Sequence, residues 1–174
     1  FQVFECVRPW GSDRSMAYHS CMILILFLAL QDPRAEFPEK VAKQLRNLAF
    51  VRVSIGDYCA GAQMHEWAQR EFRRACDLDA ECEGAWTKRG YRRVEGRWDF
   101  DPSRKIEMKN RKSGAEAEKI RKEYRKKLDS MGADFAQRFA TIAEDAAKAG
   151  LKEEAEAAWR RSLQCDPANE RARK

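Results

Sequence analysis

Histidine is scarce in this chain, which has two among 174 residues, and no Cys-x-x-Cys pair occurs. Zinc ribbons and redox dithiols depend on closely spaced cysteines, so neither is supported. No glycine-rich phosphate loop and no Ser-His-Asp set is present either. We therefore expect no enzyme activity, no catalytic residue, no bound metal and no cofactor.

Glycine and proline are also few, with 9 and 5 residues, whereas apolar residues make up 44% and charged residues 36%. Collagen-like chains need far more glycine and proline, and wholly disordered chains carry fewer apolar residues. The composition therefore favours a soluble, helix-rich protein of one domain or two small helical units.

Long apolar runs are missing, because the longest one, residues 21–30, has ten residues. A bilayer-spanning helix needs about 20, whereas a signal peptide needs an apolar stretch of this shorter length. Translation from Met16 would make residues 16–31 a signal-peptide-like segment, with residues 1–15 upstream of it. We expect a periplasmic or secreted protein without a stable membrane span after signal removal. The alternatives are a buried core helix, or a membrane anchor if the segment is not cleaved.

Four cysteines remain beyond this segment, namely Cys59, Cys76, Cys82 and Cys165. An exported chain can oxidise four cysteines in three different pairings, and the sequence leaves the pairing open. All but Cys82 also fall on apolar helical stripes, where a free cysteine packs as a small hydrophobe.

Positive charge is concentrated between Lys88 and Lys127, where 16 Lys and Arg stand against 7 Asp and Glu. We call this segment the basic strip. It is either a solvated face or a site for a polyanion such as nucleic acid or an anionic glycan, since cations neutralise phosphates and aromatic rings stack on bases. Its candidate contacts are Arg89, Arg92, Arg93, Arg97, Lys122, Arg125 and Lys126.

Hydrophobic periodicity predicts a mostly α fold with one small β-hairpin. A helix is expected from Pro38 to Gly61, a second through residues 64–76, a β-hairpin over residues 91–100 with a turn at Glu95-Gly96, and two helices after a polar linker. The expected organisation is residues 1–31 as leader, 36–87 as a first helical hairpin, 88–114 as basic β-hairpin and linker, and 115–174 as a long helix with a second helical hairpin.

A shift of 87 residues aligns the two helical hairpins with each other. Ala68 then meets Ala155, Phe72 meets Trp159, and Asp79 meets Asp166. Recurrence of one helical hairpin is typical of stacked repeat architectures, in which neighbouring units bury a shared core.

The segment from Gly150 to Asn169 resembles the second half of a tetratricopeptide (TPR) repeat, with Ala155, Trp159 and Asp166-Pro167 at the motif positions. Tandem TPR units recur every 34 residues, whereas these lie 87 apart. The run from Gly90 to Trp98 resembles a Gly-Tyr-x4-Gly-x-Trp element that follows TPR-like helices in some exported bacterial proteins. Because no such element follows the second copy, we expect that the chain is a C-terminally incomplete fragment.

The resemblance implies a protein–protein interaction or scaffold module in an extracytoplasmic compartment, with a groove formed by the first helix of each hairpin. The partner would be a protein or peptide of unknown identity. Polyanion binding through the basic strip, and a noncatalytic arm of a larger enzyme, are the alternatives. The candidate groove residues are Asn47, Arg52, Gln137, Arg138 and Thr141.

Overall fold

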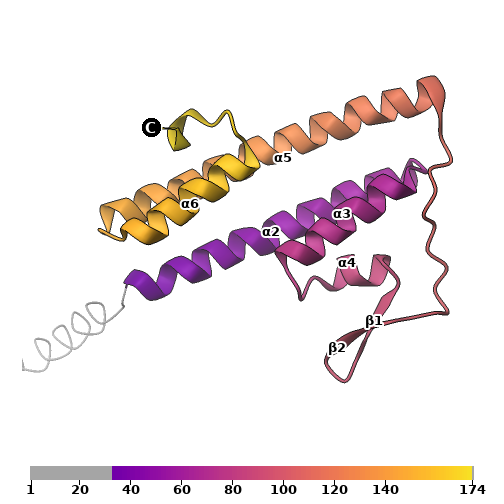
Figure 1. The fold of residues 1–174 in the computed structure, drawn as a ribbon, viewed down its shortest axis with the longest axis horizontal. Helices are drawn as coiled ribbons and strands as arrows, with labels where there is room; N and C mark the ends of the chain where they lie inside the picture. Colours follow the sequence, from indigo (N-terminus) through magenta and orange to yellow (C-terminus); the bar gives the residue numbers. More distant parts are fainter. Residues whose placement is uncertain (1–32, 174) are drawn as a thin grey trace, which may run out of the picture. The chain divides into compact units, whose positions relative to one another are not determined.

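The computed structural model describes residues 33–173, so the predicted leader, residues 1–31, lies outside the described residues. The chain is mostly helical, with one small antiparallel sheet (Figure 1). In order, the elements are α2 (Pro33–Gly61), α3 (His65–Leu78), α4 (Glu83–Lys88), β1 (Tyr91–Val94), β2 (Arg97–Phe100), α5 (Gly114–Lys148), α6 (Lys152–Cys165) and a 3-10 turn (Glu170–Ala172). The predicted fold class is confirmed at this level, but a TPR-like arrangement is not.

One helix boundary and one short helix differ from the prediction. Helix α2 begins at Pro33 rather than at Pro38, which lies inside it. The early turns hold because Pro33 also suits a helix start and because Lys40 pairs with Glu36 at 3.1 Å, four residues apart. The short helix α4 was not predicted, since six residues are too few for an apolar period to be visible.

The predicted β-hairpin and its turn are confirmed. Tyr91 pairs with Phe100 and Val94 with Arg97. The two turn residues, Glu95 and Gly96, have φ angles of 48° and 82°. Positive φ at both positions is characteristic of a two-residue hairpin turn whose backbone twist matches that of the flanking strands.

The core joins both helical hairpins through one buried apolar cluster. Along α5 the predicted stripe continues past Gly132 without losing phase, because Tyr124, Met131, Phe135 and Phe139 are all buried. The cysteines of the described part are free, and Cys59 and Cys76 are buried among apolar side chains.

The two hairpins share their loop geometry at the 87-residue offset. In the first, the Met64 N–H donates to the Cys59 carbonyl at 2.8 Å, and in the second the Leu151 N–H donates to the Ala146 carbonyl at 2.9 Å. The helix ends also agree, since ψ is 102° at Asp79 and 104° at Asp166, with φ at −143° in both. The two hairpins therefore share their local backbone geometry as well as their spacing of small and polar residues.

The hairpins are not arranged as neighbours in a solenoid. Lys127 of α5 lies over the ring of Tyr58, near the C-terminal end of α2, with Nζ 4.8 Å from the centroid. Later α5 residues, up to Phe139, share a cavity with α2 residues as early as Leu45. The first helices therefore run antiparallel, whereas the small rotation between solenoid repeats keeps equivalent helices nearly parallel.

Close packing of α5 on α6 depends on Gly132. A Cβ at this position would lie 2.6 Å from the Cys165 carbonyl oxygen, which is backbone and cannot rotate away. The side-chain-free surface of Gly132 thus lets the end of α6 approach α5 directly.

We predict that Gly132→Ala lowers the free energy of unfolding by about 1–3 kcal/mol, the usual cost of overpacking. Gly61→Ala is the control, because a Cβ there meets nothing within 4 Å. That control is expected to be neutral or slightly stabilising, since alanine is the better helix former. Urea unfolding of both variants measures the difference, and equal stabilities would contradict the close approach.

Candidate functional site

A groove follows the line where α2 and α5 meet, and we call it the α2–α5 groove. Its volume is about 720 Å³. The floor is apolar and formed by Val51, Ile55, Met131 and Phe135. Polar residues complete the lining, namely Ser54, Glu123, Lys126, Lys127, Ser130 and Asp134. One exposed apolar side chain stands beside it, since Phe50, one residue before Val51 and one helical turn before Ser54, is 71% exposed.

Four of the five predicted groove residues lie on helix faces that continue this groove. Asn47 is seven residues before Ser54 on α2 and is exposed. On α5, Arg138 pairs with Asp134 at 2.9 Å, and its guanidinium carbon lies 5.0 Å from the centroid of the Phe135 ring.

The other two predicted residues on α5 make contacts within the chain. The Thr141 hydroxyl donates to the Gln137 carbonyl at 3.1 Å, and the Gln137 side-chain oxygen accepts from Arg171 at 2.9 Å. All four residues are accessible next to the groove, and their role in binding stays a prediction.

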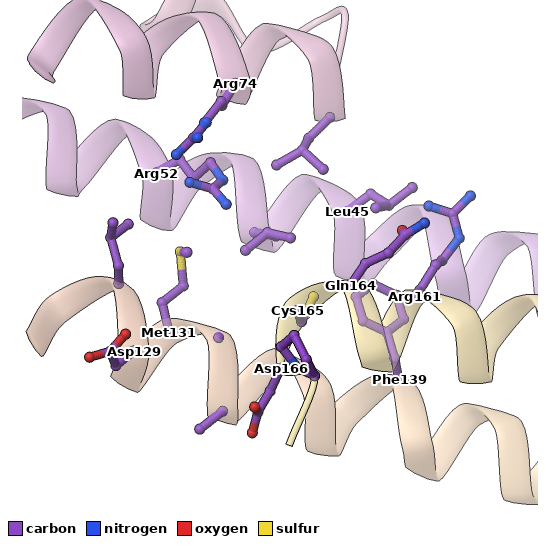
Figure 2. Close-up of a pocket in the computed structure, with 16 residues that line it drawn as sticks. Leu45, Arg52, Arg74, Asp129, Met131, Phe139, Arg161, Gln164, Cys165 and Asp166 are labelled. Carbon is purple, nitrogen blue, oxygen red and sulfur yellow. The ribbon is translucent and has the colours of Figure 1, made fainter. Parts of the chain in front are cut away.

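The fifth predicted residue, Arg52, lines a different space, a cavity of about 670 Å³ that we call the inter-hairpin cavity (Figure 2). Residues of α2, α3, α5 and α6 surround it. Its apolar wall consists of Leu45, Leu48, Leu78, Leu128, Met131 and Phe139, and its charged groups are Arg52, Arg74, Arg161, Asp129 and Asp166.

Corresponding positions of the two hairpins meet in this cavity. Arg74 and Arg161 are 87 residues apart and both line it, as do Leu78 and Cys165. The antiparallel first helices bring these equivalent faces together. Burial raises the pKa of the Cys165 thiol, and the positive charges of Arg52 and Arg161, which line the same cavity, act in the opposite direction.

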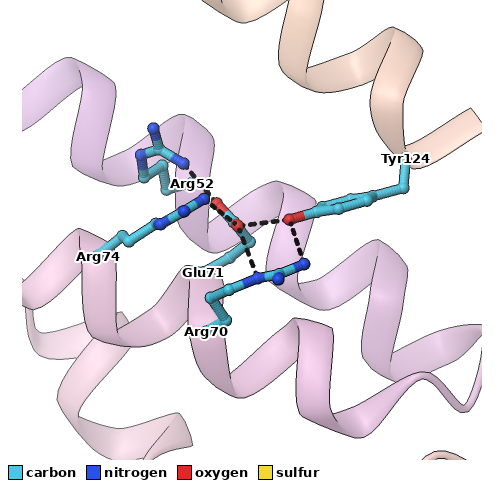
Figure 3. A network of polar contacts seen from close by, with 5 residues as sticks. All are labelled: Arg52, Arg70, Glu71, Arg74 and Tyr124. Atoms are coloured by element: carbon cyan, nitrogen blue, oxygen red, sulfur yellow. Dashed lines mark hydrogen bonds and ion pairs between the residues drawn. The ribbon is translucent and has the colours of Figure 1, made fainter. Parts of the chain in front are cut away.

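A buried carboxylate, Glu71, holds the polar network beside the cavity (Figure 3). Arg52 donates to one carboxylate oxygen at 2.5 Å, and Arg74 donates to the other at 3.0 Å. The Tyr124 hydroxyl of α5 donates to that second oxygen at 2.6 Å. Arg70 donates to the Tyr124 hydroxyl at 3.2 Å and lies 3.9 Å from the carboxylate. The network thus links α2, α3 and α5.

Tyr124 is also fixed by ring contacts. Its ring stacks on Trp67 with centroids 5.4 Å apart, and the Arg70 guanidinium lies 5.7 Å from its centroid. Burial and the hydrogen bond to Glu71 raise the pKa of Tyr124 to about 12. The phenol therefore stays protonated, and able to donate, well above neutral pH.

The sequence analysis did not identify Glu71, although a signal was present. Glu71 lies three residues after Ala68 and four before Ala75, on the face of α3 that the period predicts to be buried. The equivalent residue of the second hairpin is Ala158, and the residue equivalent to Arg52 is Phe139. An ion pair in one copy therefore occupies the place of an apolar pair in the other.

The basic strip is divided between two elements. Its first part surrounds an aromatic cluster of Trp86, Tyr91 and Trp98, in which Arg89 lies over Trp86 and Tyr91. Arg93 lies over Trp98 and pairs with Glu81 at 2.8 Å.

The remaining candidate cations of the strip are exposed. Arg92 and Arg97 belong to the β-hairpin, Lys122 and Arg125 to α5, and Lys126 lines the α2–α5 groove. Among residues 33–173, no hydrogen bond or ion pair joins the β-hairpin to α5. The candidate cations of the strip thus belong to two parts of the fold, the β-hairpin region and α5.

Within the described residues, no three His, Cys, Asp or Glu side chains gather as a metal ion would require. None of the helices described there combines the length and the apolar character needed to cross a membrane.

We predict that Glu71→Ala destabilises the fold by about 3–5 kcal/mol, because it leaves the Arg52 guanidinium, whose side chain is only 19% exposed, and the buried Tyr124 hydroxyl without their acceptor. The double variant Arg52→Phe/Glu71→Ala copies the residues of the second hairpin and should recover a large part of that loss, since an apolar pair replaces the ion pair. Chemical unfolding of the wild type, both single variants and the double variant measures the coupling. A double variant that loses the sum of the single losses would show that the two sites act independently.

We also predict that the fold loses stability at alkaline pH because Tyr124 ionises. Because its folded pKa of about 12 exceeds the ordinary value of 10.0, its contribution is complete below pH 10 and declines as pH rises toward 12. In the unfolded chain the phenol has its ordinary pKa of 10.0, so it ionises at a lower pH than in the folded chain, and this difference favours unfolding above pH 10. Comparing the pH dependence of unfolding for wild type and Tyr124→Phe isolates this decline, which should be smaller in the variant. Parallel curves would contradict the assignment.

Comparisons with protein-family models, with curated proteins and with solved structures find no match for this chain. The functional proposal therefore rests on the chemistry of the α2–α5 groove and of the inter-hairpin cavity, and not on the activity of a relative.

Proposed function

We propose that this chain is a protein–protein interaction module built from two TPR-like helical hairpins, and that it binds a segment of its partner in the α2–α5 groove. The observation that carries this proposal is the groove of about 720 Å³ with an apolar floor beside the exposed Phe50. Exposed apolar surface next to a concave floor is characteristic of interaction sites.

The groove suits an amphipathic helix or an extended segment. Val51, Ile55, Met131 and Phe135 offer apolar contact along the floor. Both signs of charge line it, with Glu123 and Asp134 against Lys126 and Lys127. Apolar anchors on one face of a bound helix, with polar residues at its edges, match this pattern.

In this proposal the TPR resemblance applies to each hairpin separately and not to the arrangement of the two hairpins. The loops and helix ends of the two hairpins agree at the 87-residue offset, which supports a common unit. The antiparallel first helices nevertheless make a groove between two facing units rather than the concave face of a solenoid. An extracytoplasmic location, inferred from residues 16–31, belongs to the same proposal, whereas a role as a noncatalytic arm of a larger enzyme is an alternative to it.

Polyanion binding through the basic strip is the second candidate function. It is favoured by Lys122 and Arg125 on α5, which are exposed and for which the described part of the chain shows no ion pair. The β-hairpin surface is less suited, since Arg89 and Arg93 already cover the aromatic rings that a base would stack on.

We predict that Phe50→Asp weakens partner binding about tenfold or more without unfolding the chain, because the side chain is 71% exposed. Phe100→Asp is the matched control, since Phe100 is 59% exposed and belongs to β2, whereas Phe50 lies on α2 next to Val51 of the groove lining. The immobilised chain and both variants are incubated with extract of the source cells, washed with increasing salt and analysed by mass spectrometry. A discrete protein should stay bound to wild type and to the control, and bind Phe50→Asp about tenfold less or weaker still.

Two results would contradict the proposal. Equal capture of the same protein by both variants would exclude the groove. Loss of all bound material at moderate salt, with nucleic acid or glycan in the eluate, would instead favour the basic strip, because counterion release makes polyanion binding strongly salt-dependent.

A further inference from the structure

We propose that the inter-hairpin cavity binds a small amphipathic anion, an aliphatic chain that ends in a carboxylate or a phosphate. This site shares Met131 with the α2–α5 groove and otherwise has a different lining, and its ligand is a small molecule rather than a protein partner. The proposal rests on the volume of the cavity, on its apolar wall and on the guanidinium groups that face it.

The volume and the wall match a small-molecule ligand. Cavities that hold such ligands measure about 300–1,000 Å³ and are lined mostly by apolar side chains with a few polar groups. This cavity measures about 670 Å³, and leucines from both sides, Leu45, Leu78 and Leu128 among them, form much of its wall. An aliphatic chain would replace water along this wall.

The guanidinium groups retain donors for an anion. In the contacts of the described part, Arg52 and Arg74 each use Nη1 toward Glu71, and a guanidinium has five N–H donors. Arg161 of α6 makes no ion pair among the described residues, and it faces the same cavity. Because Glu71 is buried and holds two of these arginines in place, their orientation is fixed before a ligand binds.

The charges of the cavity are arranged unevenly. Figure 2 shows Arg52 and Arg74 together at the upper left and Arg161 apart from them at the right, with Asp129 and Asp166 in the lower part. One oxygen of Asp166 already accepts the Ala168 N–H at 2.9 Å. An anionic head group would therefore bind at these arginines, away from the two carboxylates, with its chain directed across the apolar wall.

The test uses the full chain with dodecanoate and dodecyl phosphate as probes, below their micellar concentrations, and dodecyltrimethylammonium as the cationic control. Isothermal titration should show one anion per chain and little binding of the cation. Arg161→Glu should weaken anion binding about tenfold or more, as expected for loss of a charge-assisted hydrogen bond. Arg160→Glu, the adjacent position on an exposed face, should leave it unchanged, and Arg161→Gln should give an intermediate loss.

The position of the ligand is tested through two thiols of the same chain. Cys165 lines the cavity, whereas Cys82 is similarly half-buried and lies outside its lining. Dodecanoate should slow alkylation of Cys165, mapped by mass spectrometry, and should not change that of Cys82. Equal binding of anion and cation, equal weakening by the Arg160 and Arg161 variants, or equal protection of both thiols would each overturn the proposal. Preference for one of the two anions identifies the head group.

Discussion

The fully buried carboxylate of Glu71 is the constraint on which the arrangement of the hairpins depends. A carboxylate without water must be neutralised and hydrogen-bonded, and here the partners come from three helices. The contact with Tyr124 connects residues 53 positions apart and ties α5 to the first hairpin. Movement of α5 would remove the Tyr124 hydroxyl from a buried carboxylate oxygen, so the network restricts how the two hairpins pack.

That restriction has consequences for both candidate sites. With α5 held antiparallel to α2, their outer faces form the α2–α5 groove, and equivalent positions of the two hairpins surround the inter-hairpin cavity. In a solenoid, Arg74 and Arg161 would occupy equivalent places one repeat apart along the stack. The antiparallel arrangement instead brings both to a single cavity and gives the chain a site that neither hairpin possesses alone.

Much of the secondary structure was predictable, because its causes are local. The period of α5, the turn at Glu95-Gly96 and the end of α6 before Pro167 each depend on residues within a few positions. Helix α4 escaped prediction because it is shorter than two turns. Of the predicted groove residues, Arg52 lies elsewhere, since its partner on α3 could not be known from the spacing of α2 alone.

Periodicity, turn residues and composition act over short distances, so they were enough to define the helical hairpins, their 87-residue correspondence and the concentration of basic residues. The direction in which the hairpins meet and the role of Glu71 became visible in the folded chain, because burial of a charge depends on neighbours far along the sequence. Glu71 has an arginine 19 positions away and a tyrosine 53 positions away as its partners, and no local pattern specifies either contact.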